Sequence, residues 1–465
     1  MDPLPNDPAA PASAPPAAPP KAQRPPALWR NRDYRWWLST DTSTGLGRAL
    51  HNFAVPLLAL YVTGDPAQAG IVAAIGQVGR LVATLPGGVL ADRHDRRRLI
   101  LLGTASGVLV ATALAAFQYT GLLGFWLLTA LNLLMNVRSG LFDGVPNAAL
   151  KAVVEPRSLG SAMSANQGRD AVVSLAGGPV GGVLLVIGHA VPFAATALLN
   201  VFGLLSVLRV RADLRPRRDA ADAAGATGPG GAGKPAGHDG GTSTTRAGYL
   251  REAWEGFAWL LHRPELRGVM AISTIVNLGM NAAVTSVVFG LQQRGESPAT
   301  IGVATACVGV GMLAGAVLAP PLVRRVPTGW LGAVGLAACS GAVAVLPFVH
   351  TVPAICVVLG ASMFAAPAIN ASLLGYFTVA VPTHLLGRAN SALDLLAMGA
   401  VPLAPLVAGF GYAAWGWTGV LALCAGICGI AVVLAFCTRR LLAIPASDRW
   451  EDHAAANARE AALRR

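Results

Sequence analysis

Charged side chains within long apolar runs are the residues of this sequence whose types and spacing could do chemistry. Four stand out, namely Asp41, Arg48, Arg80 and Asp394. A charge at the centre of a bilayer costs about 2.5–3.5 kcal/mol on insertion scales, so each of these side chains is expected to face a wet cavity. Asp41 and Arg48 are seven residues apart, which places them two turns apart on one face of a helix.

Proton transfer is the chemistry that this pattern favours. Burial favours the neutral form of a carboxylate, whereas a nearby cation favours the charged form. Such a competition permits uptake and release of a proton. Asp41 is therefore the leading candidate for a proton carrier, with Arg48 as its charge partner, and Arg80 and Asp394 are further candidates for the charged site. In a second interpretation, Asp41 lies close enough to the membrane surface to be a solvated residue near a helix end.

Asparagines in the same apolar runs are candidates for a substrate cavity. An asparagine in a membrane helix can hydrogen-bond a cargo, and it can equally hydrogen-bond a neighbouring helix. The low density of buried charge favours an amphipathic cargo that is not highly charged. The six candidates are Asn52, Asn132, Asn136, Asn277, Asn281 and Asn370.

The elements that must hold these side chains are membrane helices. The sequence is 54% hydrophobic and only 12% charged, whereas soluble domains are about 25% charged. An apolar run of about 20 residues predicts a membrane-spanning helix. Twelve such runs are present, over residues 37–62, 69–91, 99–117, 122–144, 162–187, 191–210, 268–291, 300–322, 331–348, 353–374, 390–411 and 417–436.

The charges between the runs indicate the orientation. Basic residues accumulate in alternate connections, above all between Arg93 and Arg98, and such connections face the cytoplasm. Both termini are therefore expected in the cytoplasm of a multi-pass protein of the cell membrane. The net charge of +12 follows this topology and does not form a phosphate-tracking face, so no nucleic acid partner is expected.

The predicted organisation is two bundles joined by a linker. Residues 63–70 align with residues 294–302 with one extra residue, and Gly79 then falls opposite Gly311. Such a repeat predicts two pseudo-symmetric six-helix bundles with the substrate path between them. The expected parts are a disordered tail over 1–33, a bundle over 34–210, a flexible linker over 211–250, a bundle over 251–438 and a tail over 439–465.

One loop carries a resemblance to a known family. Gly88, Leu90, Ala91, Asp92, Arg93, Arg96, Arg97 and Arg98 resemble the signature between helices two and three of the major facilitator superfamily. The family usually has glycine where this chain has Asp95. The Asp-Arg-Arg-Arg variant resembles the branch of drug and siderophore exporters that includes macrolide efflux proteins and the enterobactin exporter. Gly178, Pro179 and Gly182 resemble the Gly-Pro motif of antiporters in the superfamily, which implies a hinge in helix five.

The resemblance implies a conformational latch on the cytoplasmic side. Asp92, with Arg93 beside it, would face the start of helix eleven near residues 387–390, where a helix N-terminus favours a carboxylate. Arg96 would reach Asp143, and Gly88 would permit close contact between helices two and eleven. Asp92→Asn is then expected to lose transport while keeping membrane insertion.

The function implied is secondary active transport, not enzymatic catalysis. Residues 228–234 almost form a phosphate loop, but Pro235 stands where Ser or Thr would bind magnesium. Neither a cofactor nor a metal site is expected. We expect a monomer that exports a small amphipathic drug or secondary metabolite in exchange for protons, within the lipid bilayer. Siderophore or lysophospholipid export, nutrient import, and a non-transporting sensor or scaffold stay open as alternatives.

Overall fold

The computed structural model describes residues 28–214, 264–381 and 399–453. Within these ranges the regular secondary structure is entirely helical, as predicted. The predicted linker over 211–250 lies almost wholly outside the described residues, as do the first part of predicted helix eleven and Asp394.

The first bundle consists of seven α-helices. The helices are α1 (Arg32–Thr63), α2 (Pro66–Arg93), α3 (Arg96–Tyr119), α4 (Phe125–Phe142), α5 (Val145–Val153), α6 (Leu159–Ile187) and α7 (Val191–Leu208). Predicted span four, over 122–144, corresponds to α4, and after a bend at residues 143–144 the chain continues as α5 in the connection that follows this span.

The second bundle repeats this arrangement. Predicted span ten is interrupted at Ala365, directly before a helix with Pro367 in its first turn, where a proline is tolerated. Gly416 has a φ of 61° and breaks α16 into two arms that form the end of span eleven and all of span twelve. The helices are α10 (Pro264–Gln293), α11 (Pro298–Arg325), α12 (Thr328–Val345), α13 (Val352–Phe364), α14 (Ala366–Ala380), α16 (Ala404–Cys437) and α17 (Arg439–Leu442).

The described helices account for the predicted number of crossings. Ten stretches among them are long and apolar enough to span a membrane. α1 is not among the ten, because polar residues such as Asp41, Arg48 and His51 interrupt its apolar run. With α1 included, and the two arms of α16 counted separately, the described residues supply twelve spans.

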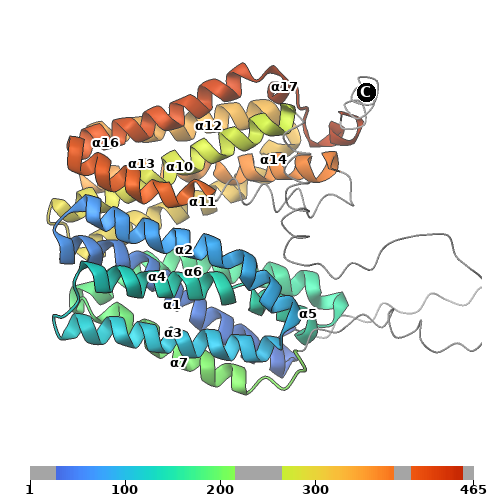
Figure 1. The fold of residues 1–465 in the computed structure, drawn as a ribbon. Helices are drawn as coiled ribbons and strands as arrows, with labels where there is room; N and C mark the ends of the chain where they lie inside the picture. The colour runs from blue at the N-terminus through green and yellow to red at the C-terminus, as the bar shows by residue number, and fades with distance from the viewer. Residues whose placement is uncertain (1–27, 215–263, 382–398, 454–465) are drawn as a thin grey trace, which may run out of the picture.

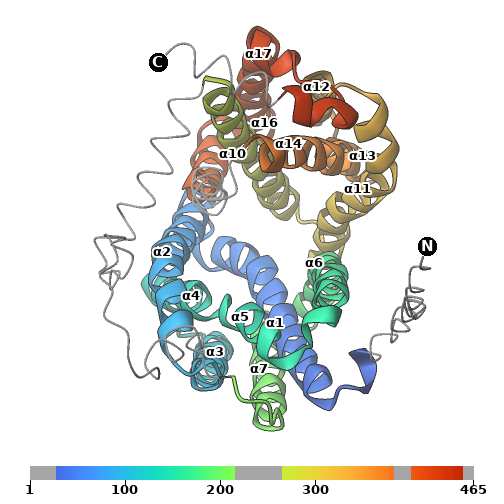
Figure 2. The same cartoon turned by 90° about the vertical axis from the view of Figure 1, so that its right-hand side faces the viewer.

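The two bundles meet along two pairs of helices. Figure 1 shows α1 to α7 on one side and α10 to α17 on the other, and Figure 2 shows α2 beside α16 and α6 beside α11. A buried apolar cluster continues across the interface, with Leu58 of α1 and Phe289 of α10 among its fully buried members. The amide of Gln292 on α10 donates to the carbonyl oxygen of Leu57 on α1 at 2.8 Å.

The two ends of the molecule differ. We call the end where α2 and α11 begin the closed end, and the end where they finish, at Arg93 and Arg325, the arginine end. The first and last described helices, α1 and α17, both lie at the arginine end, because α1 begins there and α17 follows the end of α16. An even number of crossings therefore separates the two ends of the described chain.

Glycines allow the bundles to touch at the closed end. A Cβ on Gly70 of α2 would collide with the carbonyl of Pro405 on α16, and one on Gly302 of α11 would collide with the carbonyl of Gly178 on α6. Reciprocally, Gly182 of α6 faces Pro298 and Gly409 of α16 faces Pro66. We call these two contacts, α2 with α16 and α6 with α11, the glycine seam. Small residues let membrane helices approach to backbone distance.

The seam follows the repeat seen in the sequence. Gly70 and Gly302 are equivalent in the alignment, and each meets a proline-containing helix of the other bundle. Gly79 packs on Leu133 of α4, and its counterpart Gly311 packs on Gly360 of α13. Equivalent glycines thus make equivalent contacts in the two halves, as expected for two pseudo-symmetric bundles.

Candidate functional site

Asp41 forms an ion pair with a helix other than its own. A carboxylate oxygen of Asp41 on α1 lies 2.6 Å from Nη1 of Arg169 on α6. Arg169 also binds Asp170, with Nη2 at 2.7 Å from Oδ1. In this conformation the ion pair of Asp41 is therefore with Arg169 and not with Arg48, its predicted charge partner. Seven residues span about 10.5 Å along a helix, so each of the two side chains reaches a partner on a neighbouring helix instead.

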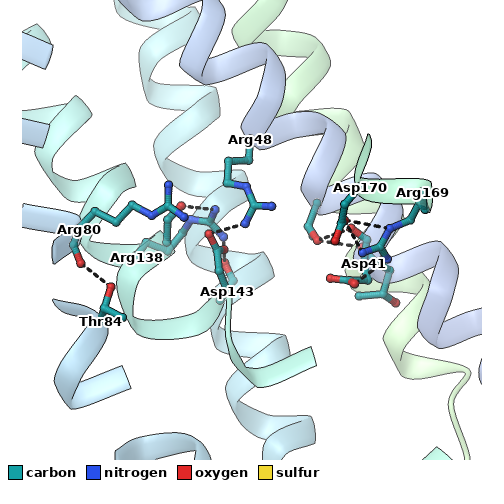
Figure 3. A network of polar contacts seen from close by, with 12 residues as sticks. Asp41, Arg48, Arg80, Thr84, Arg138, Asp143, Arg169 and Asp170 are labelled. Atoms are coloured by element: carbon teal, nitrogen blue, oxygen red, sulfur yellow. Dashed lines mark hydrogen bonds and ion pairs between the residues drawn. The ribbon is translucent and has the colours of Figure 1, made fainter. Parts of the chain in front are cut away.

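Arg48 pairs with Asp143. Its Nη1 donates to Oδ2 of Asp143 at 2.7 Å, which ties the middle of α1 to the end of α4. The expected contact of Arg96 with Asp143 is not formed. Arg96 begins α3, and its Nε donates instead to the carbonyl oxygen of Ala91 at 3.3 Å, within the turn between α2 and α3. Figure 3 shows this group beside the Asp41–Arg169–Asp170 group.

Two further arginines in the first bundle have no carboxylate partner among the described residues. Arg138 on α4 is only 7% exposed. Its Nη1 donates to the carbonyl oxygen of Gly103 at 3.0 Å, its Nη2 to Ser139 at 3.3 Å, and its Nε has no hydrogen-bond partner. Arg80 is exposed and lies midway along α2. Arg138 lies within predicted span four, and no role was predicted for it.

A narrow polar pocket brings these arginines together. Its volume is about 10 Å³, which is room for one water molecule. Arg48, Arg80 and Arg138 line it from α1, α2 and α4. Asn200 and His51 line it too, and each has one buried polar atom without a partner, Oδ1 and Nδ1 respectively.

A larger cavity lies between the bundles. It has a volume of about 390 Å³ and is lined by α1, α6, α10 and α11. We call it the seam cavity. Arg48 and Asn52 line both the seam cavity and the polar pocket, so the two spaces adjoin. The remaining lining combines the carboxylate of Asp170 with small polar and apolar side chains, including Thr285, Thr305, Phe53, Val173, Val284 and Val288.

The predicted asparagines divide into two groups. Asn52 lines the seam cavity, and Asn136 lines the polar pocket. Asn132 is buried and joins helices, since its amide nitrogen donates to the carbonyl oxygen of Val72 at 2.9 Å and its Oδ1 lies 3.2 Å from Nε2 of His51.

The other three asparagines lie in the second bundle and line neither space. The side chain of Asn281 donates to the carbonyl oxygen of Asn277, one turn earlier on α10, and Asn370 is exposed on α14.

The predicted hinge residues lie at the glycine seam. Gly178 and Gly182 face α11, while Gly177 and Gly181 on the same helix face Ala49 and Phe53 of α1. Pro179 lies inside α6. Helix α6 thus packs between α1 of its own bundle and α11 of the second bundle, and it also carries Arg169.

The latch prediction falls partly outside the described residues. The side chain of Asp92 and its expected partners over 387–390 are not among the described residues. No described atom lies within 4 Å of a Cβ built on Gly88. Among the described residues, α2 approaches α16 closely at Gly70, at the closed end.

Comparison with known proteins identifies the family. The model of the Major Facilitator Superfamily matches residues 42–392 and matches again over residues 269–461. The chain belongs to the Major Facilitator Superfamily. Uncharacterized MFS-type transporters from two strains of Mycobacterium tuberculosis, CDC 1551 / Oshkosh and ATCC 25618 / H37Rv, are each 26% identical to it over 194 residues. The match covers 41% of this chain and 44% of each relative.

Solved structures share the fold of this superfamily member. The nucleoside transporter NupG superposes with a TM-score of 0.65 at 13% identity, covering 87% of this chain and 99% of NupG. An inward-facing bacterial homologue of the lysosomal transporter Spinster gives 0.65 at 15% identity, covering 89% and 98%. An inward-facing bacterial homologue of ferroportin gives 0.63 at 16% identity, covering 90% and 100%. These superpositions show that the chain has the same helical fold as these three proteins.

Proposed function

We propose that this transporter exports a small amphipathic molecule across the cell membrane by alternating access, driven by protons. The observation that carries the proposal is the seam cavity, which lies between the two bundles and combines Arg48 and Asp170 with apolar walls. Such a lining suits a cargo with one polar end and one apolar end. A cavity at the interface of two repeats is where rocking of the bundles would expose a cargo alternately to each side.

The arginine end would face the cytoplasm, with both termini on that side. This orientation follows from the basic loops at that end, which hold Arg93, Arg96, Arg97, Arg98, Arg324 and Arg325. The contact between the bundles at the closed end then corresponds to an inward-facing conformation. Formation of the Asp92 latch on the cytoplasmic side would accompany the opposite, outward-open state.

The Asp41–Arg169 pair is our candidate for proton coupling. Both side chains are mostly buried, with 16% and 13% of their surface exposed. A proton on Asp41 would release Arg169, which retains Asp170 as a partner. Protonation would thus neutralise the carboxylate of Asp41, which lies between α1 and α6. Helix α6 is the helix of this pair that contacts the second bundle.

A lysophospholipid is a second candidate cargo within the same mechanism. An apolar groove of about 700 Å³ lies between α2, α4 and the segment that begins α16. Its described lining is entirely apolar and includes Val78, Val82, Leu133 and Leu406. A groove of this kind would accommodate an acyl chain.

Transport into everted membrane vesicles tests the proposal. The full-length protein should accumulate an amphipathic substrate when a proton gradient is imposed, and accumulation should collapse on addition of a protonophore. Antibiotics, siderophores and lysophospholipids are screened in parallel as candidate substrates. Accumulation that is insensitive to the protonophore would refute proton coupling. Uptake in the reverse orientation only would refute export, and a lack of transport for every compound would favour a sensor or scaffold.

A further inference from the structure

The charged residues in the interior of the membrane spans are unevenly distributed. Among the described residues, every charged side chain well inside a span belongs to the first bundle. Four of them are arginines, Arg48, Arg80, Arg138 and Arg169, and three are carboxylates, Asp41, Asp143 and Asp170. The described interior therefore carries one positive charge more than it carries negative charges.

The ion pairs leave the excess positive charge around the polar pocket. Arg169 binds Asp41 and Asp170, so that group has an excess of negative charge. Asp143 binds Arg48, and no described carboxylate pairs with Arg80 or Arg138. The group around the polar pocket thus holds three guanidinium ions and one carboxylate, and Figure 3 shows its four side chains in a row.

Arg138 has a hydrogen-bond donor without a partner. Arg138 is more than nine-tenths buried, lines the polar pocket and has no partner for its Nε. An unpaired charge is costly in a low-dielectric interior unless a counter-charge approaches it. The pocket has room for only about one water molecule, so a bulky anion would not enter it. An anionic group would lie at its mouth, where Arg48 borders the seam cavity.

From this arrangement we infer that the cargo is an amphipathic oxyanion, a molecule with a carboxylate, sulfonate or phosphate group on an apolar body. The inference rests on the proposed transport function and adds the charge of the cargo. The oxyanion is held by Arg48 at the mouth of the polar pocket, with the charges of Arg80 and Arg138 behind it. The apolar body lies in the seam cavity against Val173, Val284 and Val288. Guanidinium groups suit this task because they bind oxyanions with two parallel hydrogen bonds.

The experiment uses three probes with the same apolar body and different charge. These are 2-naphthoate, 2-naphthamide and 2-naphthylmethylammonium, with binding measured on the full-length protein in nanodiscs of neutral phosphatidylcholine. We expect the carboxylate to bind at least about tenfold more tightly than the amide, because hydrogen bonds to a charged partner are the stronger ones. Equal binding of carboxylate and amide, tighter binding of the ammonium probe, or no binding of any probe would overturn the inference.

Single arginine substitutions test which side chains cause the preference for the carboxylate probe over the amide probe. Arg80→Gln should abolish it by weakening binding of the carboxylate more than binding of the amide, and Arg80 is exposed, so its loss should not prevent folding. Arg138→Gln tests the buried charge. Arg324→Gln is the matched control, because Arg324 is exposed at the arginine end, away from both cavities. An unchanged preference in Arg80→Gln would contradict the assignment. Binding of the carboxylate without any transport in vesicles would instead refute the proposed function alone.

Discussion

At the residue scale, the membrane-embedded charges form two separate groups, each of which joins α1 to another helix. Arg169 connects α1 to α6, and Arg48 connects α1 to α4. The type of each side chain and its presence in a span were predictable from the sequence. The partners were not, because Asp41 and Arg48 lie near one another in the chain but each has its nearest opposite charge on a different helix. A pairing of this kind depends on helix packing, which a single sequence does not specify.

Asp41→Asn tests the proton-coupling proposal at this scale. The amide retains the shape of the carboxylate but carries no charge and takes up no proton in the physiological range. We expect the variant to insert and fold, and to lose the stimulation of export by a proton gradient. Initial rates in vesicles with and without the gradient measure this effect. Asp448→Asn serves as the control, because Asp448 is 68% exposed near the end of the described chain. Normal gradient-driven export by Asp41→Asn would remove Asp41 from this role.

At the scale of the elements, the contact between the bundles depends on backbone-to-backbone packing. Gly70 of α2 and Gly302 of α11 are equivalent in the repeat and contact proline-containing helices of the opposite bundle. The sequence predicted the repeat and its register because glycine positions survive in both halves. It did not predict the close contact that α2 makes with α16 at Gly70. Gly88 and Gly70 lie at opposite ends of α2, and the partners expected near Gly88, over 387–390, lie outside the described residues.

Gly302→Ala and Gly70→Ala should each destabilise this conformation. The added methyl group would collide with a main-chain carbonyl, and overpacking of this kind costs about 1–3 kcal/mol. Thermal unfolding of the purified protein should therefore begin at a lower temperature in both variants. Gly332→Ala on α12 is the matched control, since no described atom lies within 4 Å of its Cβ. If Gly302→Ala unfolded at or above the temperature of the wild type, close backbone packing at the glycine seam would not require glycine there.

At the scale of the whole molecule, the two bundles touch at the closed end, and a cavity lies between them. The number of spans and the division into two bundles followed from the lengths of apolar runs and from the repeat. The conformational state did not, since alternating access requires that one sequence supports both states with a small difference in free energy. The ion-paired helix α6 belongs to the first bundle and forms one side of the glycine seam, so protonation at Asp41 and movement of the bundles would be coupled through it.

Distances between spin labels at the two ends test rocking of the bundles most directly. One pair, Arg98→Cys with Arg325→Cys, spans the arginine end, and another, Thr120→Cys with His350→Cys, spans the closed end; all four sites are exposed. Cys437, which is also exposed, is replaced by serine in both. When a transported substrate and a proton gradient are supplied, we expect the distance at the arginine end to shorten while the distance at the closed end lengthens. Distances that stay constant, or that change in the same direction at both ends, would contradict alternating access in this protein.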